Sequence, residues 1–323
     1  MKKCLIAMGE LIIDKIKLIS VKYPVDEYQS YPGGAPANVA YCVAKLGGSS
    51  LYLSQVGDDQ EGHFLVDTMK TAPMDVQHIR FSKDYTTSIA YVHVLEHGER
   101  EFTFKREHAA DLYYQAEDID EKIFENASIL HFGSVNLVPS PAKIAHMKAI
   151  ELAQKNQMMI SFDPNLRLSL WKNQDDLINT VQAFIPLVHL LKVSSEELLL
   201  LSNETDENLA VKSLFQGSVQ WIIVTKGSLG ATLYSKFDSI SVPASSTKAI
   251  DTTGAGDAFM GGFLYRMLQR EHYPLKARNY EDDLIFAACV ASIVVERVGA
   301  MLAMPMLAEV KKRSEDCASL LIR

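Results

Sequence analysis

The chain has 323 residues, 48% of them hydrophobic and 22% charged, which is enough apolar material to bury a large core. Its formal net charge of −8 argues against non-specific nucleic-acid binding, because phosphate contacts need clustered lysine and arginine. Four widely spaced cysteines, and the lack of any apolar stretch near the roughly 20 residues of a transmembrane helix, favour a cytoplasmic protein without membrane contact.

Predicted strands alternate with helix-length segments along the chain. Glu10 and Asp14 interrupt the first apolar run, which favours a strand over a signal peptide. Buried strands are predicted at Leu5–Ile13, Leu51–Val56, Ile129–Phe132, Met158–Phe162, Leu187–Val193 and Trp221–Thr225. Helices are predicted between them, including Ala37–Leu46, Ala142–Gln154 and Leu177–Ile185. This alternation predicts an α/β fold with a mostly parallel, Rossmann-type sheet covered on both faces, and residues 1–323 are expected to form one domain.

Two segments, at about residues 15–32 and 86–108, break this alternation and look rich in β-structure. In the second segment, the alternation of Ile89 and Tyr91 predicts a strand that turns back at His97–Gly98. The two segments are expected either to pair as a small sheet that forms a lid over a site, or to remain separate surface hairpins.

A glycine-rich turn stands directly before a helical pattern that begins near Phe259. A helix N-terminus exposes unpaired N–H groups and the positive end of the helix dipole, and glycines let an anion approach them. Gly254 and Gly256 are therefore predicted to cradle a phosphoryl group. The next residue, Asp257, is a candidate acceptor for the proton of an attacking hydroxyl, unless it only stabilises the helix start.

Residues 251–259, D-T-T-G-A-G-D-A-F, resemble the C-terminal motif of the PfkB (ribokinase-like) carbohydrate kinases without a mismatch. The resemblance implies a ribokinase-like fold with a small β-sheet lid, and it implies that Asp257 is the catalytic base. The anion hole would be made by three consecutive residues, Gly254, Ala255 and Gly256. Carbonyl groups around Asp251 and Thr253 would form part of a monovalent-cation site, although the sequence leaves open whether K⁺ is bound.

A second motif, P-G-G-A-P-A-N-V-A at residues 32–40, resembles the N-terminal motif of the same family. Its two glycines let backbone approach a polyol, and Pro36 suits the first turn of a helix. Asp14, at the end of the first predicted strand, could accept hydrogen bonds from two hydroxyls. The expected substrate-binding residues from this part of the chain are Asp14, Gly33, Gly34 and Asn38.

The segment S-F-D-P-N-L-R at residues 161–167 resembles fructokinases and 2-keto-3-deoxygluconate kinases. The resemblance implies that Arg167 contacts the substrate or a phosphate and that Asn165 lies near the transferred phosphate on the nucleotide side. Arg106 falls where fructokinases carry a similar pattern at the edge of the lid. It could reach the sugar, or it could be an ordinary surface arginine.

Three further segments resemble the nucleotide and metal side of the family's site. Glu197 would assist Mg²⁺ through water, in a segment where Ser194 stands at the position of the family's usual asparagine. Alternatively, Glu197 only starts a helix, or the adjacent Glu196 takes the metal role. Residues 298–300 resemble the loop that closes the adenine and cation sites. The nucleotide-side turn would be formed by Thr225, Gly227 and Gly230, which could instead form a plain hairpin.

The resemblance implies an ATP- and Mg²⁺-dependent sugar kinase, with phosphorylation of D-fructose at its 6-hydroxyl as the expected reaction. Alternative substrates are 2-keto-3-deoxygluconate, an aminoimidazole riboside and ribose, and an alternative of another class is a non-catalytic sugar-binding regulator. No P-loop motif and no G-x-G-x-x-G after the first strand are present. The exposed strand edges of the lid would allow a homodimer.

Overall fold

The computed structural model describes residues 3–17, 28–94 and 100–320, and these contain two sheets. The larger sheet has nine strands in the order β13-β12-β11-β10-β9-β8-β1-β4-β5. Its strands are β1 (Cys4–Met8), β4 (Ser49–Gly57), β5 (Ile79–Ser82), β8 (Ile129–Phe132), β9 (Met159–Phe162), β10 (Leu190–Ser194), β11 (Trp221–Thr225), β12 (Ala231–Ser235) and β13 (Ser239–Val242). All neighbours from β11 to β5 run parallel, and β12 and β13 add an antiparallel edge, so the predicted mostly parallel sheet is confirmed.

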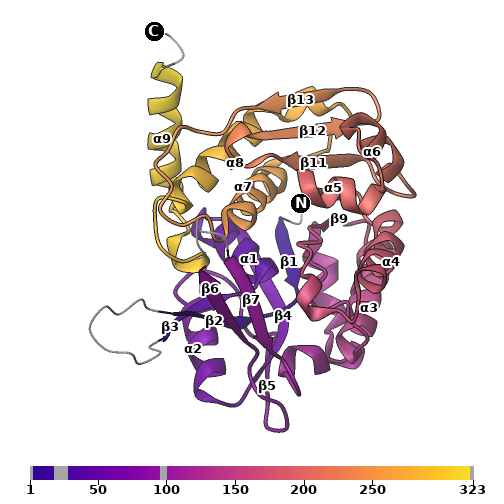
Figure 1. The fold of residues 1–323 in the computed structure, drawn as a ribbon, viewed down its shortest axis with the longest axis vertical. Coiled ribbons are helices and arrows are strands. Elements are labelled where there is room, and N and C mark those ends of the chain that lie inside the picture. The colour runs from indigo at the N-terminus through magenta and orange to yellow at the C-terminus, as the bar shows by residue number, and fades with distance from the viewer. Residues whose placement is uncertain (1–2, 18–27, 95–99, 321–323) are drawn as a thin grey trace.

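Helices cover both faces of this sheet (Figure 1). Alternate residues of β1 serve opposite cores, because Leu5 and Ala7 pack with one set of helices and Ile6 and Met8 with the other. On the first face lie α1 (Ala35–Lys45), α2 (Gln60–Met69), α7 (Ala255–Gln269) and α8 (Glu281–Val294). On the second lie α3 (Pro141–Lys155), α4 (Gln174–Phe184), α5 (Ser195–Ser202) and α6 (Glu207–Leu214), and α9 (Leu307–Leu320) ends the described chain. Within the described ranges, no helix is long and apolar enough to cross a membrane.

The prediction of one strand over Leu5–Ile13 is wrong, because two strands in different sheets occupy it. The chain leaves the large sheet after Met8 through Gly9, which has a φ of 154°. A Cβ at Gly9 would stand 2.7 Å from Cγ of Pro36, so glycine lets this crossing pass close beneath the start of α1. Asp14 therefore lies inside a strand of the small sheet and not at a strand end of the large one.

The small sheet brings together the two β-rich segments, as predicted for a lid sheet. Its strands are β2 (Ile12–Lys17), β3 (Tyr28–Gly33), β6 (Ile89–Val94) and β7 (Arg100–Lys105), in the order β3-β2-β6-β7. In Figure 1 this sheet stands beside α1 at the edge of the larger layer. The turn predicted at His97–Gly98 lies outside the described residues.

The helices α1 and α7 pack closely because a glycine lies between them. A Cβ at Gly261 would stand 2.5 Å from Cβ of Cys42 and 3.3 Å from the carbonyl oxygen of Val39, so no larger residue fits without moving a helix. This close packing brings the N-terminal turns of the two helices together, although Asn38 on α1 and Asp257 on α7 are far apart in the sequence.

Candidate functional site

A cavity of about 290 Å³ opens where the N-terminal turns of α1 and α7 meet the small sheet. The predicted residues that line it are Asp14, Gly34, Asn38, Asn165, Arg167, Thr253, Gly254, Gly256 and Asp257. The structure thus brings together residues from the three motifs at residues 32–40, 161–167 and 251–259, and it adds Asp14 from the small sheet. Sequence reasoning gave no role to the other lining residues, which include Glu10, Phe104, Val135 and Lys192.

A second cavity of about 480 Å³ lies on the other side of the glycine-rich turn. Thr225, Gly227 and Gly230 line it, and they also lie at the turn of the antiparallel β11–β12 hairpin, so this segment is a hairpin turn that borders a cavity. Its opposite wall is largely apolar and comes from α7 and α8. Thr252 and Gly256 line both cavities, which therefore meet at the start of α7.

Asp257 stands in the first turn of α7, where it accepts a hydrogen bond at Oδ2 from Nδ2 of Asn38 at 2.7 Å. One edge of the side chain faces the cavity, but surrounding protein removes most of the water from the carboxyl group. This burial raises the pKa of Asp257 to about 6, and the negative charge of Asp163 acts in the same direction. The Asn38 hydrogen bond and the positive charges of Lys192 and Arg167 oppose that rise. A carboxylate with this pKa can accept a proton near neutral pH.

Lys192 is a buried cation at the centre of the site that sequence reasoning missed. It lies in β10 with 7% of its surface exposed, and its Nζ donates to Oδ2 of Asp163 at 2.8 Å. The Nζ atom is only 3.0 Å from where a Cβ at Gly256 would stand, so the ammonium group lies against the glycine-rich turn. The available signal was a single lysine inside the apolar strand L-L-K-V-S, since a buried charge of this kind needs a partner or a task.

The glycine-rich turn depends on its glycines and on a buried aspartate. Gly254 has a φ of 75°, and a Cβ there would stand 2.5 Å from Cβ of Ala300. Asp251 is buried and accepts from the N–H groups of Thr253 at 2.8 Å and Gly299 at 3.1 Å, which ties the turn to the loop at residues 298–300. The N–H of Ala255 donates to the carbonyl of Thr252 at 3.2 Å. The amides that follow Ala255 lie in the first helical turn, where N–H groups lack helical acceptors.

Each of the predicted substrate-binding residues near the start of α1 makes a different contact. Gly33 leaves room for a carboxylate, because a Cβ there would stand 2.3 Å from Oδ2 of Asp14. Gly34 is the N-cap of α1 with a φ of 114°, and a Cβ there would meet the carbonyl oxygen of Glu10 at 2.2 Å. Asn38 uses its amide nitrogen on Asp257, so it positions this aspartate as well as facing the cavity.

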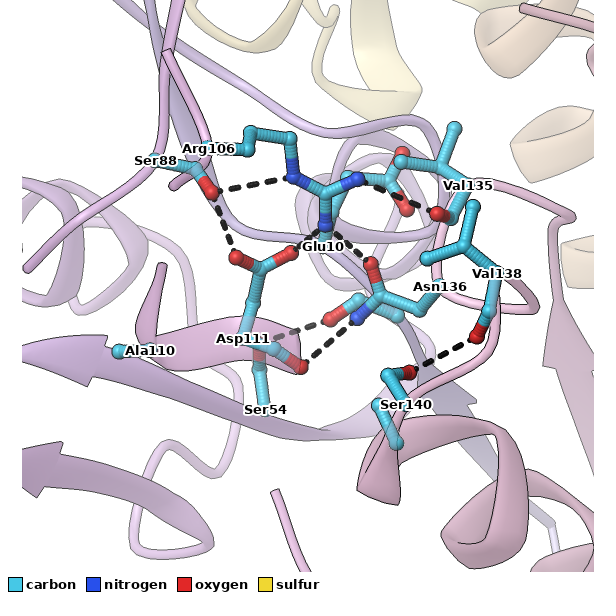
Figure 2. A network of polar contacts seen from close by, with 12 residues as sticks. Glu10, Ser54, Ser88, Arg106, Ala110, Asp111, Val135, Asn136, Val138 and Ser140 are labelled. Carbon is cyan, nitrogen blue, oxygen red and sulfur yellow. Dashed lines mark hydrogen bonds and ion pairs between the residues drawn. The ribbon is translucent and has the colours of Figure 1, made fainter. Parts of the chain in front are cut away.

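Arg106 is buried, so the reading of an ordinary surface arginine is wrong. Figure 2 shows its guanidinium group at the centre of a polar network. One nitrogen pairs with the carboxylate of Asp111 and donates to Oδ1 of Asn136 at 2.7 Å, and the others donate to Val135 O and Ser88 Oγ, each at 3.2 Å. Within the described chain, Arg106 does not line the first cavity, whereas Val135 does. Arg106 therefore braces the base of the small sheet against the loop after β8.

Glu197 makes the contacts of a helix-start residue. Its Oε2 accepts from the N–H of Ser194 at 2.8 Å, and Ser194 Oγ accepts in return from the N–H of Glu197, which forms a capping box at the start of α5. Its Oε1 accepts from the N–H of Leu166 at 2.7 Å and so fixes the segment that carries Arg167. The neighbouring Glu196 accepts a hydrogen bond at Oε2 from Ser194 Oγ at 2.8 Å.

Comparison with known proteins matches a family model described as "pfkB family carbohydrate kinase" to residues 3–307. A probable fructokinase-4 of Arabidopsis thaliana is 32% identical over 314 residues, which is 96% of each chain. Fructokinase-2 of Solanum lycopersicum is 33% identical over 309 residues, which is 94% of each chain. Among solved structures, a fructokinase with bound ATP from Xylella fastidiosa has a TM-score of 0.90 at 32% identity, covering 98% of this chain and 100% of that one. A fructokinase double mutant from Vibrio cholerae O395, in fructose, ADP and potassium ion bound form, has a TM-score of 0.87 at 30% identity, covering 96% and 98%.

The raised pKa of Asp257 predicts that this carboxylate destabilises the fold at high pH. The native state retains a proton on Asp257 between pH about 4, near the pKa of an unfolded aspartate, and pH about 6, so stability falls as pH rises through this range. We expect Asp257→Asn to raise the free energy of unfolding by about 1–3 kcal/mol at pH 8 and by little at pH 4. Urea unfolding at both pH values measures this, with Asp206→Asn at an exposed helix N-cap as the control. An equal change at both pH values would contradict the prediction.

Proposed function

The chain belongs to the pfkB family of carbohydrate kinases, and from that premise we propose that it transfers the γ-phosphoryl group of ATP to the 6-hydroxyl of D-fructose. The observation that carries the proposal is the position of Asp257. It stands at the glycine-rich turn where the two cavities meet, with a raised pKa and a buried cation beside it. A hydroxyl held in the first cavity and a phosphate chain held in the second would meet at this residue.

In the proposed reaction, the carboxylate of Asp257 accepts the proton of the attacking hydroxyl while the hydroxyl oxygen bonds to the γ-phosphorus and the bond to ADP breaks. Asn38 holds the carboxylate in place through its 2.7 Å hydrogen bond. The negative charge that moves from the phosphoryl group to ADP would be stabilised by first-turn amides of α7 and by Nζ of Lys192. Arg167, which also lines the cavity, would add a second positive charge to the same region.

The second cavity fits a nucleotide by shape and polarity. Gly230, with a φ of 97°, has no room for a side chain, because a Cβ there would stand 2.1 Å from Val242 O, and Gly227 also has a positive φ. We propose that this turn and Thr225 contact the nucleotide, and that Asn165 faces its phosphates from the first cavity. The apolar wall, which includes Phe259, suits a flat aromatic ring such as adenine.

The oxygen ligands that the protein offers fit a metal ion that is bound mainly by the phosphates of the nucleotide. In the parts of the chain that the structure describes, no group of three or more His, Cys, Asp or Glu could hold a metal. Mg²⁺ commonly takes water and substrate phosphates with one or two carboxylates, and it neutralises phosphate charge. We propose Glu197 as a contact to it through water, since both of its oxygens already accept backbone amides. Carbonyls near Asp251 and Thr253, beside the buried Asp251 carboxylate, fit a monovalent cation such as K⁺.

Fructose is the proposed sugar because the relatives and structures reported above are named fructokinases over nearly the whole chain. An aminoimidazole riboside kinase from Salmonella enterica is also similar in structure, with a TM-score of 0.84 at 27% identity, so that riboside remains the second candidate. A sugar-binding regulator is disfavoured by the presence of the base, the glycines of the turn and the buried lysine together.

We further propose that residues 1–323 form a single domain whose inserts at about 15–32 and 86–108 act as a lid, and that the protein is cytoplasmic. The strands β3 and β7 are the edges of the small sheet, and such edges can pair with a second copy. Sedimentation that shows only monomer at micromolar concentration would contradict a dimer of this kind.

The reaction is tested by ADP release with Mg²⁺ and K⁺ present, across fructose, ribose, 2-keto-3-deoxygluconate, aminoimidazole riboside and glucose. We expect turnover on fructose, and we expect Asp257→Ala to lower kcat by about 10²–10⁴, the usual contribution of a general base. Turnover on a different sugar would keep the chemistry and replace the substrate. No turnover on any sugar, with the fold intact by circular dichroism, would contradict the kinase assignment.

The pKa of Asp257 sets the acid limb of the rate profile. Only the ionised carboxylate accepts a proton, so kcat at saturating sugar and ATP should be flat above pH about 6 and fall about tenfold per pH unit below it. Lys192 lowers the pKa of Asp257, so Lys192→Met should move the break to higher pH, in addition to reducing the rate. Initial rates between pH 5 and 9 measure both effects. A break at the same pH in wild type and Lys192→Met would contradict the role assigned to this pair.

A further inference from the structure

Glu10 is a buried carboxylate in the first cavity to which neither the sequence motifs nor the proposed reaction gives a role. It lies between β1 and β2 with 3% of its surface exposed. Its Oε1 accepts from the N–H of Ala35 at 2.8 Å, at the start of α1. Its Oε2 is buried and has no hydrogen-bond partner among the residues that the structure describes. One oxygen of Glu10 therefore serves the fold, the other is buried without a hydrogen-bond partner among the described residues, and Glu10 as a residue lines the cavity.

The neighbouring charges do not satisfy the second oxygen. Arg106 is close enough to lower the pKa of Glu10, but its guanidinium group is taken up by Asp111, Asn136 and two further acceptors (Figure 2). Burial raises the pKa of Glu10 to about 7, although the N–H groups of Glu10 itself and of Ala35 and the charge of Arg106 all lower it, and the charge of Asp111 adds to the rise. On the neighbouring strand β4, the Tyr52 hydroxyl donates to the backbone carbonyl of Glu10 at 2.6 Å and not to Oε2. A buried polar atom without a hydrogen-bond partner destabilises the fold unless a ligand or water reaches it.

The position of Glu10 relative to the proposed base follows from α1. Ala35 holds Glu10 and Asn38 holds Asp257, and these two residues are three positions apart on one helix, roughly 4.5 Å along its axis. Both carboxylates are therefore anchored to the first turn of α1, and both residues line the same cavity. A sugar whose reacting hydroxyl lies at Asp257 would present another hydroxyl toward Glu10.

We propose that Oε2 of Glu10 accepts a hydrogen bond from a sugar hydroxyl other than the one that is phosphorylated, which makes Glu10 a specificity-determining residue. This inference rests on the proposed function, because it takes the ligand of the first cavity to be a polyol. A hydroxyl that donates to the carboxylate supplies the missing partner and favours the ionised form of Glu10. A sugar that lacks this hydroxyl leaves the oxygen buried and unpaired, and is discriminated against for that reason.

The test is Glu10→Gln, in which the amide oxygen can still accept from Ala35 while the amide nitrogen replaces Oε2 and can only donate. We expect KM for the phosphorylated sugar to rise about tenfold to a hundredfold, the loss typical of a hydrogen bond to a charged group, with KM for ATP nearly unchanged and the melting temperature not lowered. The matched control is Asp206→Asn, which alters a helix-capping carboxylate away from both cavities and should leave KM unchanged. An unchanged KM in Glu10→Gln would assign Oε2 to a buried water and overturn the inference.

Deoxy sugars identify the contacted hydroxyl. One of 1-deoxy-, 3-deoxy- and 4-deoxyfructose, or of the corresponding analogues of whichever sugar is turned over, should bind wild type more weakly than the parent sugar does. The same analogue should bind Glu10→Gln about as well as the parent sugar does. If every analogue loses the same affinity in wild type and in Glu10→Gln, the contact is contradicted, because two groups that interact must show non-additive effects when both are removed. A wild type that phosphorylates no sugar would contradict the proposed function instead, so the two failures are distinguishable.

Calorimetry of sugar binding without ATP gives a second readout that a purely structural role would not move. A hydroxyl that donates to the ionised carboxylate lowers the pKa of Glu10 from about 7, so binding at pH 7 should release up to about half a proton, and affinity should rise with pH through this range. Titrations in two buffers of different ionisation enthalpy measure the release. The release should be absent in Glu10→Gln, and equal release in both proteins would overturn the inference.

Discussion

One hydrogen bond, from the Asn38 amide to the Asp257 carboxylate, joins two parts of the chain that are 219 residues apart, and the rest of the site depends on it. It can form because α1 and α7 approach so closely that a Cβ at Gly261 would collide with Cβ of Cys42. The same packing brings the glycine-capped start of α1 and the glycine-rich turn before α7 to a common cavity. Two motifs that are separate in sequence thereby become one site, and the proposed base is held by the helix whose first turn carries residues proposed to face the sugar.

The charges around Asp257 are balanced by residues that have opposite effects on it. Burial and the nearby Asp163 raise the pKa of Asp257, whereas Lys192 and Arg167 lower it. Asp163 also pairs with Lys192, so this aspartate keeps a buried cation next to the turn while it makes the base easier to protonate. A lysine at this depth would be unfavourable alone, and the pair is retained at a cost that a hydrophobic pair would avoid. The pair lies against the glycine-rich turn, which is where the proposed reaction would move negative charge.

The sequence predicts most of the large sheet and the glycine-rich turn, because their signals are local. Buried strands such as Ile129–Phe132 and Trp221–Thr225 have the predicted bounds, since short apolar runs between turn residues define them. The break at Gly9 was missed because the apolar run continues on both sides of it, and only the approach of Pro36 explains it. Arg106, Lys192 and Glu10 could not be placed either, since their burial depends on partners from distant segments. A single charged residue in a sequence does not indicate which carboxylate, amide or cavity it meets in the fold.

The two sides of the proposed site come mostly from different halves of the chain, and the Asn38–Asp257 hydrogen bond joins them. Glu10 lies between β1 and β2, Asp14 lies in β2 and Gly34 starts α1, whereas Lys192, Gly254 and Asp257 come from the second half. The Arg106 network ties the small sheet to Asp111 and to the loop that carries Val135, all of which belong to the first half (Figure 2). A change in the small sheet or its network therefore acts first on the part of the cavity that faces the sugar. The electrostatic arrangement at the glycine-rich turn is held by other contacts, namely Asp251 with Gly299 and Lys192 with Asp163, so it can stay constant while the accepted polyol changes.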